Sequence, residues 1–146
     1  MNDELREASI ELLLHCARIV RAARQGSSAP VAQMRVLSAL DEHGPLRVST
    51  LAAIANCAQP TMTGTVATLL SGGDVTKAPD PSDARASLVA LTPEGRDRLG
   101  DLRRQYADVL VARIEAGTGL TPADLRAAAD VLRTILTTPV REDDRA

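Results

Sequence analysis

The chain has 146 residues, of which 45% are hydrophobic and 25% charged, a composition that excludes a disordered or collagen-like protein and fits one globular domain. Its formal net charge of −2 excludes a chain that coats nucleic acid by bulk charge, but not a local DNA-reading surface. With no Trp, no Phe and one Tyr, the core must consist of small aliphatic side chains, which favours packed helices.

Hydrophobic periodicity predicts four helices in the first half of the chain. The first is long and amphipathic, with a broad buried side, and ends at Gly26. The second has Pro30 near its first turn and ends before Gly44, and the fourth ends at the pair Gly72-Gly73. The approximate ranges of the four are 5–25, 30–43, 49–55 and 59–71.

The second half begins with strand-like patterning. Residues 75–78 and 87–91 are predicted strands, and the Pro- and Asp-rich segment 79–83 between them predicts a β-hairpin with a long tip. Thr92, followed by a proline, is typical of the start of a helix, and Thr121 repeats this signal for a last helix. Two short helices followed by a hairpin make a winged helix-turn-helix, so the expected fold is mainly α with a small β-hairpin wing.

Three stretches of the chain resemble a known family. They are an apolar helix that ends in glycine and is followed by Leu51-Ala52, the stretch Pro60-Thr61-Met62-Thr63-Gly64, and Asp80-Pro81-Ser82-Asp83-Ala84-Arg85 leading into 88–95. In these stretches the chain resembles the MarR family of winged-helix transcription regulators.

The resemblance implies one MarR-like domain over 1–146. Its DNA-binding lobe would cover 34–92, and its helical dimerisation region would cover 1–28 and 93–138. It further implies a homodimer that binds double-stranded DNA at a pseudo-palindromic operator, and the cysteine usage and acidic N-terminal residues lead us to expect a cytoplasmic protein. Repression would be relieved by a small aromatic or phenolic effector, but the sequence does not show where such a ligand would bind.

The predicted DNA contacts lie on the outward face of the fourth helix and on the wing. The uncharged run 48–73 suits a helix that uses hydroxyls, amides and N–H groups in the major groove. The candidate residues are Gln59, Thr61, Thr63, Gly64, Thr68, Lys77 and Arg85. Gln59 is the strongest candidate for a base contact, because an amide can pair with adenine through two hydrogen bonds.

Two of these assignments have alternatives. The threonines can be solvent-tolerant residues without a contact to DNA. Arg85 can enter the minor groove, with Asp83 orienting the wing as the resemblance implies, or Asp83 can hold Arg85 in a surface ion pair.

Three positions depart from the family pattern: Ala58 replaces a capping residue, Asp74 a large apolar residue and Ala84 a basic one. Residues 34–96 contain 5 basic and 6 acidic side chains, which gives a net charge of −1. A lobe of this charge attracts DNA weakly. An alternative function is therefore a winged-helix protein-interaction module with little DNA affinity.

The sequence offers no constellation for catalysis, a metal or a cofactor. Cys16 and Cys57 stand in no metal-binding or disulfide spacing, which fits a reducing compartment. The acidic residues 1–4 are unlike a signal peptide, and the polar content of 48–73 argues against a membrane span. Some family members carry an oxidation-sensing thiol near Cys16, but its apolar neighbours favour a buried structural residue. A thiol-based redox regulator remains the other alternative.

Overall fold

The computed structural model describes residues 2–139, which contain six helices and three strands. The helices are α1 (Asn2–Gly26), α2 (Val31–His43), α3 (Val48–Ala55), α4 (Gln59–Ser71), α5 (Pro93–Glu115) and α6 (Pro122–Thr137), and the strands are β1 (Leu46–Arg47), β2 (Val75–Asp80) and β3 (Asp83–Leu91). The chain forms two compact units, divided between Leu110 and Val111. Within the described range, no helix combines the length and apolar character that a bilayer span requires.

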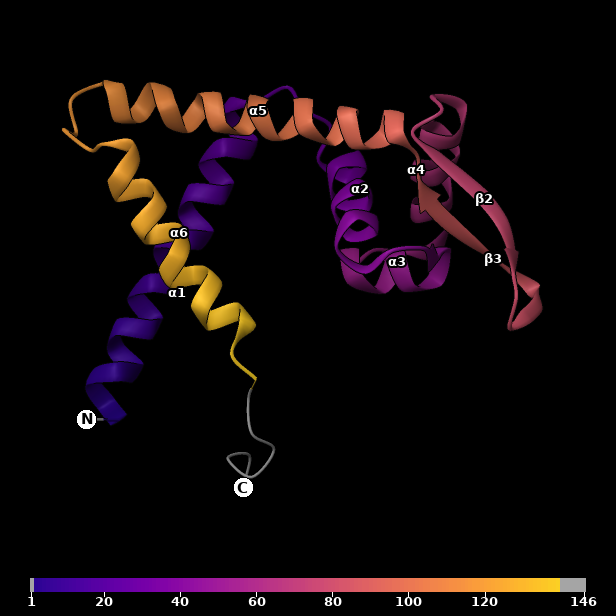
Figure 1. Ribbon diagram of the computed structural model, residues 1–146, viewed down its shortest axis with the longest axis horizontal. Coiled ribbons are helices and arrows are strands. Elements are labelled where there is room, and N and C mark those ends of the chain that lie inside the picture. Colours follow the sequence, from indigo (N-terminus) through magenta and orange to yellow (C-terminus); the bar gives the residue numbers. More distant parts are fainter. Residues whose placement is uncertain (1, 140–146) are drawn as a thin grey trace. The chain divides into compact units, whose positions relative to one another are not determined.

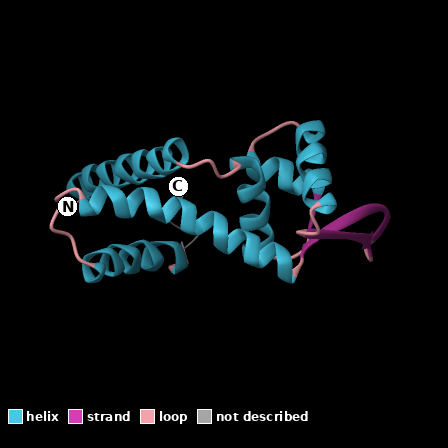
Figure 2. Ribbon diagram, turned by 90° about the horizontal axis from the view of Figure 1, so that it is seen from above, coloured by secondary structure: helices cyan, strands magenta, loops and turns pink. Residues whose placement is uncertain are grey.

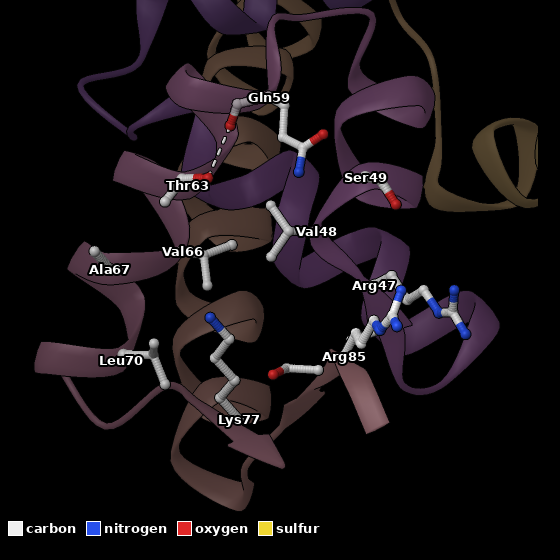
Figure 3. A pocket seen from close by; sticks show the side chains of 12 residues that line it. Arg47, Val48, Ser49, Gln59, Thr63, Val66, Ala67, Leu70, Lys77 and Arg85 are labelled. Carbon is white, nitrogen blue, oxygen red and sulfur yellow. Dashed lines mark hydrogen bonds between the residues drawn. The ribbon is translucent and has the colours of Figure 1, made fainter. Parts of the chain in front are cut away.

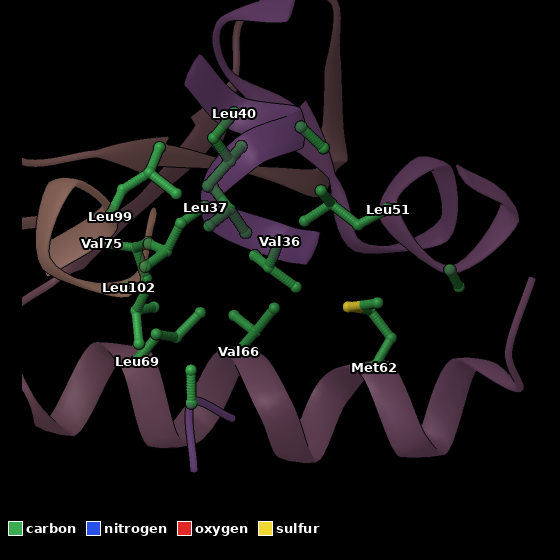
Figure 4. Packing of buried hydrophobic residues seen from close by; sticks show 14 residues of the cluster. Val36, Leu37, Leu40, Leu51, Met62, Val66, Leu69, Val75, Leu99 and Leu102 are labelled. Atoms are coloured by element: carbon green, nitrogen blue, oxygen red, sulfur yellow. The ribbon is translucent and has the colours of Figure 1, made fainter. Parts of the chain in front are cut away.

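The core of the first unit joins α2, α3 and α4 to the sheet. Met62, Val66 and Leu69 lie on one side of α4, and Figure 4 shows them pointing towards α2 and α3. At the centre, Leu37 of α2 is completely buried. Among the described residues, the buried hydrophobic ones are Ala, Val and Leu, as expected, together with Met62, whereas the isoleucines expected in the core are not among them.

The predicted mainly helical fold with a small β wing is confirmed. β2 and β3 form an antiparallel hairpin that projects beyond the helices of the first unit (Figures 1 and 2). β1 was not predicted, because two residues are too few to produce an alternating pattern. It pairs with the other side of β3, with Leu46 opposite Val89 and Arg47 opposite Leu88, so the strand order is β1-β3-β2.

The hairpin closes in a short turn, so the prediction of a long tip was wrong. β2 continues to Asp80 and β3 begins at Asp83, which leaves Pro81 and Ser82 between the strands. The Asp80 carboxylate accepts hydrogen bonds from the Ser82 backbone N–H at 2.9 Å and from its hydroxyl at 2.8 Å. Proline signals a turn in sequence, but Pro79 is tolerated here because β2 is an edge strand.

The start of α5 packs closely against the turn between α4 and β2. As predicted, Thr92 precedes the helix as its cap: its hydroxyl accepts from the Gly95 N–H at 2.9 Å and donates to the Gly73 carbonyl at 2.7 Å. Gly95 is buried, and a Cβ atom at this position would overlap the backbone carbonyl of Asp74. Glycine is therefore required for the close approach of the two backbones.

Neither terminal helix, each taken by itself, contains a buried residue. On α1, Leu13 is 70% exposed, and on α6, Ile135 is 57% exposed. The predicted apolar side of the first helix therefore exists but is not buried within the single chain. α6 begins with a capping box in which Thr121 and Asp124 bond to each other's backbone N–H, so the predicted start signal is confirmed.

Candidate nucleic-acid interface

An open groove lies between α4, the start of α3 and the hairpin. Its volume is about 410 Å³, and Figure 3 shows Gln59 of α4, Lys77 of β2 and Arg85 of β3 around it. All three side chains belong to exposed residues. The fold thus brings together predicted contact residues that are separated by up to 26 positions in sequence.

The first turn of α4 has no side-chain cap. Ala58 precedes the helix in an extended conformation and offers no side-chain acceptor, as its sequence position predicted. In the described part of the chain, the exposed Thr61 hydroxyl makes no hydrogen bond. The backbone N–H groups of this turn and the Thr61 hydroxyl are therefore donors available to an anion.

The other threonines on this face are already engaged with the helix. Thr63 donates its hydroxyl proton to the Gln59 carbonyl at 2.9 Å, and Thr68 donates to the Gly64 carbonyl at 3.2 Å. In this conformation their hydroxyls can only accept a further bond, and a phosphate contact would require the hydroxyl to rotate. Gly64 lies between them with open space where a side chain would stand, so the exposed face of α4 is flat there.

The wing holds Arg85 in a defined backbone position. Asp83 accepts a hydrogen bond from the Arg85 backbone N–H at 3.0 Å. The Asp83 carboxylate lies 3.6 Å from the guanidinium of Arg47, and among the described residues no ion pair involves Arg85. Asp83 thus contacts the backbone of Arg85 and pairs with a different arginine.

Arg47 is the residue of this region whose role the sequence did not reveal. Its Nε donates to Asp80 Oδ2 at 2.7 Å, and its Nη2 lies 2.5 Å from the same oxygen. Asp80 is only 8% exposed. The backbone N–H and hydroxyl of Ser82, together with Arg47, hold the pKa of Asp80 below its ordinary value, against the opposing effect of burial.

These contacts change how the charge of the lobe should be judged. Asp80 and Asp83 are paired with Arg47, and Asp41 is paired with Arg103 of α5 at 3.0 Å. Arg47 offsets only one of its two aspartates, so that cluster keeps a net charge of −1, whereas Asp41 is neutralised by Arg103, which lies outside the counted residues 34–96. Because Arg47 is engaged in this cluster, Lys77 and Arg85 are the basic side chains of the groove without a carboxylate partner among the described residues.

A second hollow, which we call the α2 cavity, lies in the first unit beside α2. Its volume is about 650 Å³, and its lining comes from α1, α2, the end of α3 and α5. Apolar side chains on its wall are Val20, Met34 and Ile54. The charged or ionisable ones are Arg24, Arg35, His43 and the acidic Glu42, whose carboxylate lies 3.8 Å from His43. Tyr106 also lines it, and its hydroxyl is buried with no hydrogen-bond partner in the described structure.

The two cysteines differ in their surroundings. Cys16 on α1 and Cys57 before α4 are both half-buried free thiols, and Cys57 packs against the hydrophobic core. The expectation of a fully buried Cys16 is thus not met within the single chain. Among the hydrogen bonds of the described residues, none involves either sulfur.

Comparisons with known proteins point to one family. The MarR family profile matches residues 30–87. An uncharacterized HTH-type transcriptional regulator of Mycobacterium bovis is 30% identical over 120 residues, which are 82% of this chain and 84% of that protein.

Solved structures agree with this result. A MarR family transcriptional regulator from Silicibacter pomeroyi is 26% identical, with a TM-score of 0.56 and 92% of each chain covered. BpsR of Bordetella bronchiseptica, whose structure concerns regulation of DNA binding by 6-hydroxynicotinic acid, is 25% identical, with a TM-score of 0.56 and coverage of 90% and 94%.

The three-stranded wing, the exposed helix beside it and these relatives lead to one assignment. Members of the family are transcriptional regulators and not enzymes; they bind DNA, dimerise and sense small ligands. The chain belongs to the MarR family of DNA-binding, winged helix-turn-helix transcriptional regulators.

Proposed function

We propose that the chain acts as a homodimeric repressor that binds a pseudo-palindromic operator and is released by a small organic anion. In each half-site, α4 enters the major groove with Gln59 on a base edge, and Arg85 reaches the neighbouring minor groove. The observation that carries this proposal is the groove in which Gln59, Lys77 and Arg85 converge beside an uncharged helix face. Half-site centres then lie roughly 10 bp apart.

The uncapped start of α4 supports this placement. Its free N–H groups and the Thr61 hydroxyl are suited to a backbone phosphate. Gly64 leaves no side chain to obstruct a base pair, and Thr63 and Thr68 offer acceptor oxygens to base amino groups. Asp83 serves to orient the wing through the Arg85 backbone.

The α2 cavity is the proposed ligand site. Its apolar walls with Arg24, Arg35 and His43 suit a small aromatic acid, and the unpaired Tyr106 hydroxyl offers a further hydrogen bond. The regulation of BpsR by 6-hydroxynicotinic acid supports this ligand class, since that molecule is a small aromatic acid.

A contact of Arg35 suggests how occupancy would reach the DNA-binding helix. Its Nη1 donates to the carbonyl of Ala55, the last residue of α3, at 3.4 Å. Ala55 and Asn56 also line the cavity, and Asn56 begins the turn into α4 with a left-handed φ of 50°. A ligand carboxylate would compete for Arg35 with a stronger, charge-assisted bond and loosen the turn that positions α4.

DNA binding is tested with a duplex from the region upstream of the chain's own gene, by fluorescence anisotropy across salt concentrations. Lys77 and Arg85 from two protomers give about four cationic contacts with DNA, each releasing roughly one counterion, and a slope of log K against log salt near −4. Gln59→Ala should weaken binding by about 1–3 kcal/mol and relax preference at one base pair, leaving the slope unchanged. No binding even at low salt would support the protein-interaction module instead.

Ligand release is tested separately with benzoate and its neutral counterpart benzamide as probes. Benzoate should dissociate the complex and benzamide should not, because only the acid can pair with Arg35. Arg35→Gln removes the bond to Ala55 as the ligand would, so it should lower DNA affinity by itself and abolish the further response to benzoate. Equal release by both probes, or a normal response in Arg35→Gln, would contradict an anion site in this cavity.

A further inference from the structure

Arg47 lines the groove, but its side chain is engaged with the far side of the sheet. It lies in β1, on one side of the central strand β3, while its partner Asp80 ends β2 on the other side. The side chain therefore links the two outer strands across the middle one. The link ends where the pairing of β2 with β3 is irregular, between Pro79 and Asp80. Irregular pairing of this kind bends a strand and re-aims the residues beyond it.

The hydrogen bonds around Arg47 continue to the tip of the wing. Asp80 uses one oxygen for Arg47 and the other for the backbone N–H and hydroxyl of Ser82, which closes the turn. The guanidinium also lies 3.6 Å from Asp83, whose second oxygen accepts from the Arg85 backbone N–H. A continuous path of polar contacts thus connects Arg47 to the backbone of Arg85.

The guanidinium of Arg47 is oriented to hold the wing and not to contact a phosphate. Nε and Nη2 both face the Asp80 carboxylate and Nη1 faces Asp83, so all three nitrogens are directed at the wing. Asp80 is buried, and without Arg47 its negative charge would lack its cationic partner. A phosphate could recruit Arg47 only by breaking these contacts.

We infer that Arg47 is a positioning residue for DNA binding: it fixes the bend of the wing through Asp80 and Asp83, and thereby aims Arg85, without contacting DNA itself. The inference rests on the proposed placement of Arg85 in the minor groove. According to this inference, Asp80 raises DNA affinity although it is an acidic residue beside the DNA-facing groove.

The first test is a double-mutant cycle between Arg47 and Arg85, using the duplex from the chain's own upstream region. Arg85→Gln should lower affinity about tenfold in the natural protein, but less than about twofold when Arg47→Gln is already present. Arg47→Lys should not restore affinity, since an ammonium keeps the charge but not the fork that reaches both aspartates. Two independent phosphate contacts would give additive losses, about 100-fold together, and overturn the inference.

The second test asks whether substitution of Asp80 raises or lowers DNA affinity. Asp80→Asn removes a negative charge beside the groove, and it should nevertheless lower affinity severalfold. If Arg47 were a phosphate contact, the same substitution would release it and raise affinity. Asp41→Asn is the matched control, because it breaks the Asp41–Arg103 pair between α2 and α5 with the same change in charge and should leave affinity unchanged.

Hydrogen exchange separates failure of this inference from failure of the proposed interface. In DNA-free protein, Arg47→Gln should accelerate exchange of the Ser82 and Arg85 amides while the amides of α2 stay protected. If Arg85→Gln alone leaves affinity unchanged, the placement of Arg85 on DNA is wrong, and the exchange result still decides whether Arg47 holds the wing. Unchanged exchange in Arg47→Gln overturns the positioning role directly.

Discussion

The lobe from α2 to β3 buries its apolar side chains, and the terminal helices leave theirs exposed. On α4, Met62, Val66 and Leu69 are each at most 2% exposed, although the helix has only 13 residues. On α1, which has 25 residues, no side chain is buried. Both helices show hydrophobic residues at helical spacing, so the pattern alone does not distinguish them.

The difference teaches that periodicity predicts a helix with an apolar side, but not which molecule covers that side. The lobe completes its core within one chain. Each terminal helix exposes several large apolar side chains, among them Leu13 on α1 and Ile135 on α6. Monomeric proteins seldom leave such side chains exposed in large patches. We therefore expect the stability of the lobe to be independent of protein concentration, and that of the terminal helices to depend on it.

The largest expected effect comes from Leu37→Ala. Leu37 is completely buried, so truncation should lower the free energy of unfolding of the lobe by about 2–5 kcal/mol at any protein concentration. Chemical denaturation at two concentrations measures this loss. Leu13→Ala on α1 removes the same atoms from an exposed site and is the control. A concentration-dependent loss for Leu37→Ala would contradict the distinction between the regions.

Association should respond most strongly to a charge on the apolar side of α1. Leu12→Lys should shift sedimentation equilibrium at micromolar concentration from dimer to monomer, because a dimer interface would have to bury the ammonium. Glu7→Gln changes the charge of the same helix by the same amount on its polar side and should leave the dimer intact. A natural protein that sediments as a stable monomer would remove the basis of the comparison.

Acid should loosen the wing before the helical core. The folded-state pKa of Asp80 is lowered, so its contribution to stability is complete above the ordinary aspartate value, about pH 4, and is lost as the pH falls through the lowered pKa. Exchange of the hairpin amides should therefore accelerate in that acidic window, relative to the amides of α2. In Asp80→Asn the hairpin should exchange faster at neutral pH, with a smaller further change on acidification.

The smallest expected effect is a gain in stability. Ala58→Ser should raise the free energy of unfolding of the lobe by about 1 kcal/mol, because the new hydroxyl can accept from the free Thr61 N–H. Thermal denaturation measures the gain. The same bond would occupy a donor that we assign to phosphate, so operator affinity should fall slightly. An affinity that rises with stability would place the start of α4 away from the DNA backbone.

Much of the fold could be predicted because its signals are local. Proline and glycine at helix boundaries, the cap at Thr92 and the missing cap at Ala58 each depend on a few neighbouring residues. The contacts of Arg47 could not be predicted in this way. They join residues 33 positions apart through a two-residue strand that leaves no pattern, and Asp80 resembled a loop residue until its burial was known.

The direct passage of β1 into α3 has a mechanical consequence. Arg47 is both the last residue of the strand and the residue preceding α3, which begins at Val48. A displacement of the wing tip is therefore transmitted through the hydrogen-bonded strands to β1 and from there directly to α3, because no loop separates β1 from α3. In the proposed complex, DNA that curves towards the wing would press on α3 and α4 through the sheet, so we expect affinity to depend on the curvature of the bound duplex as well as on its bases.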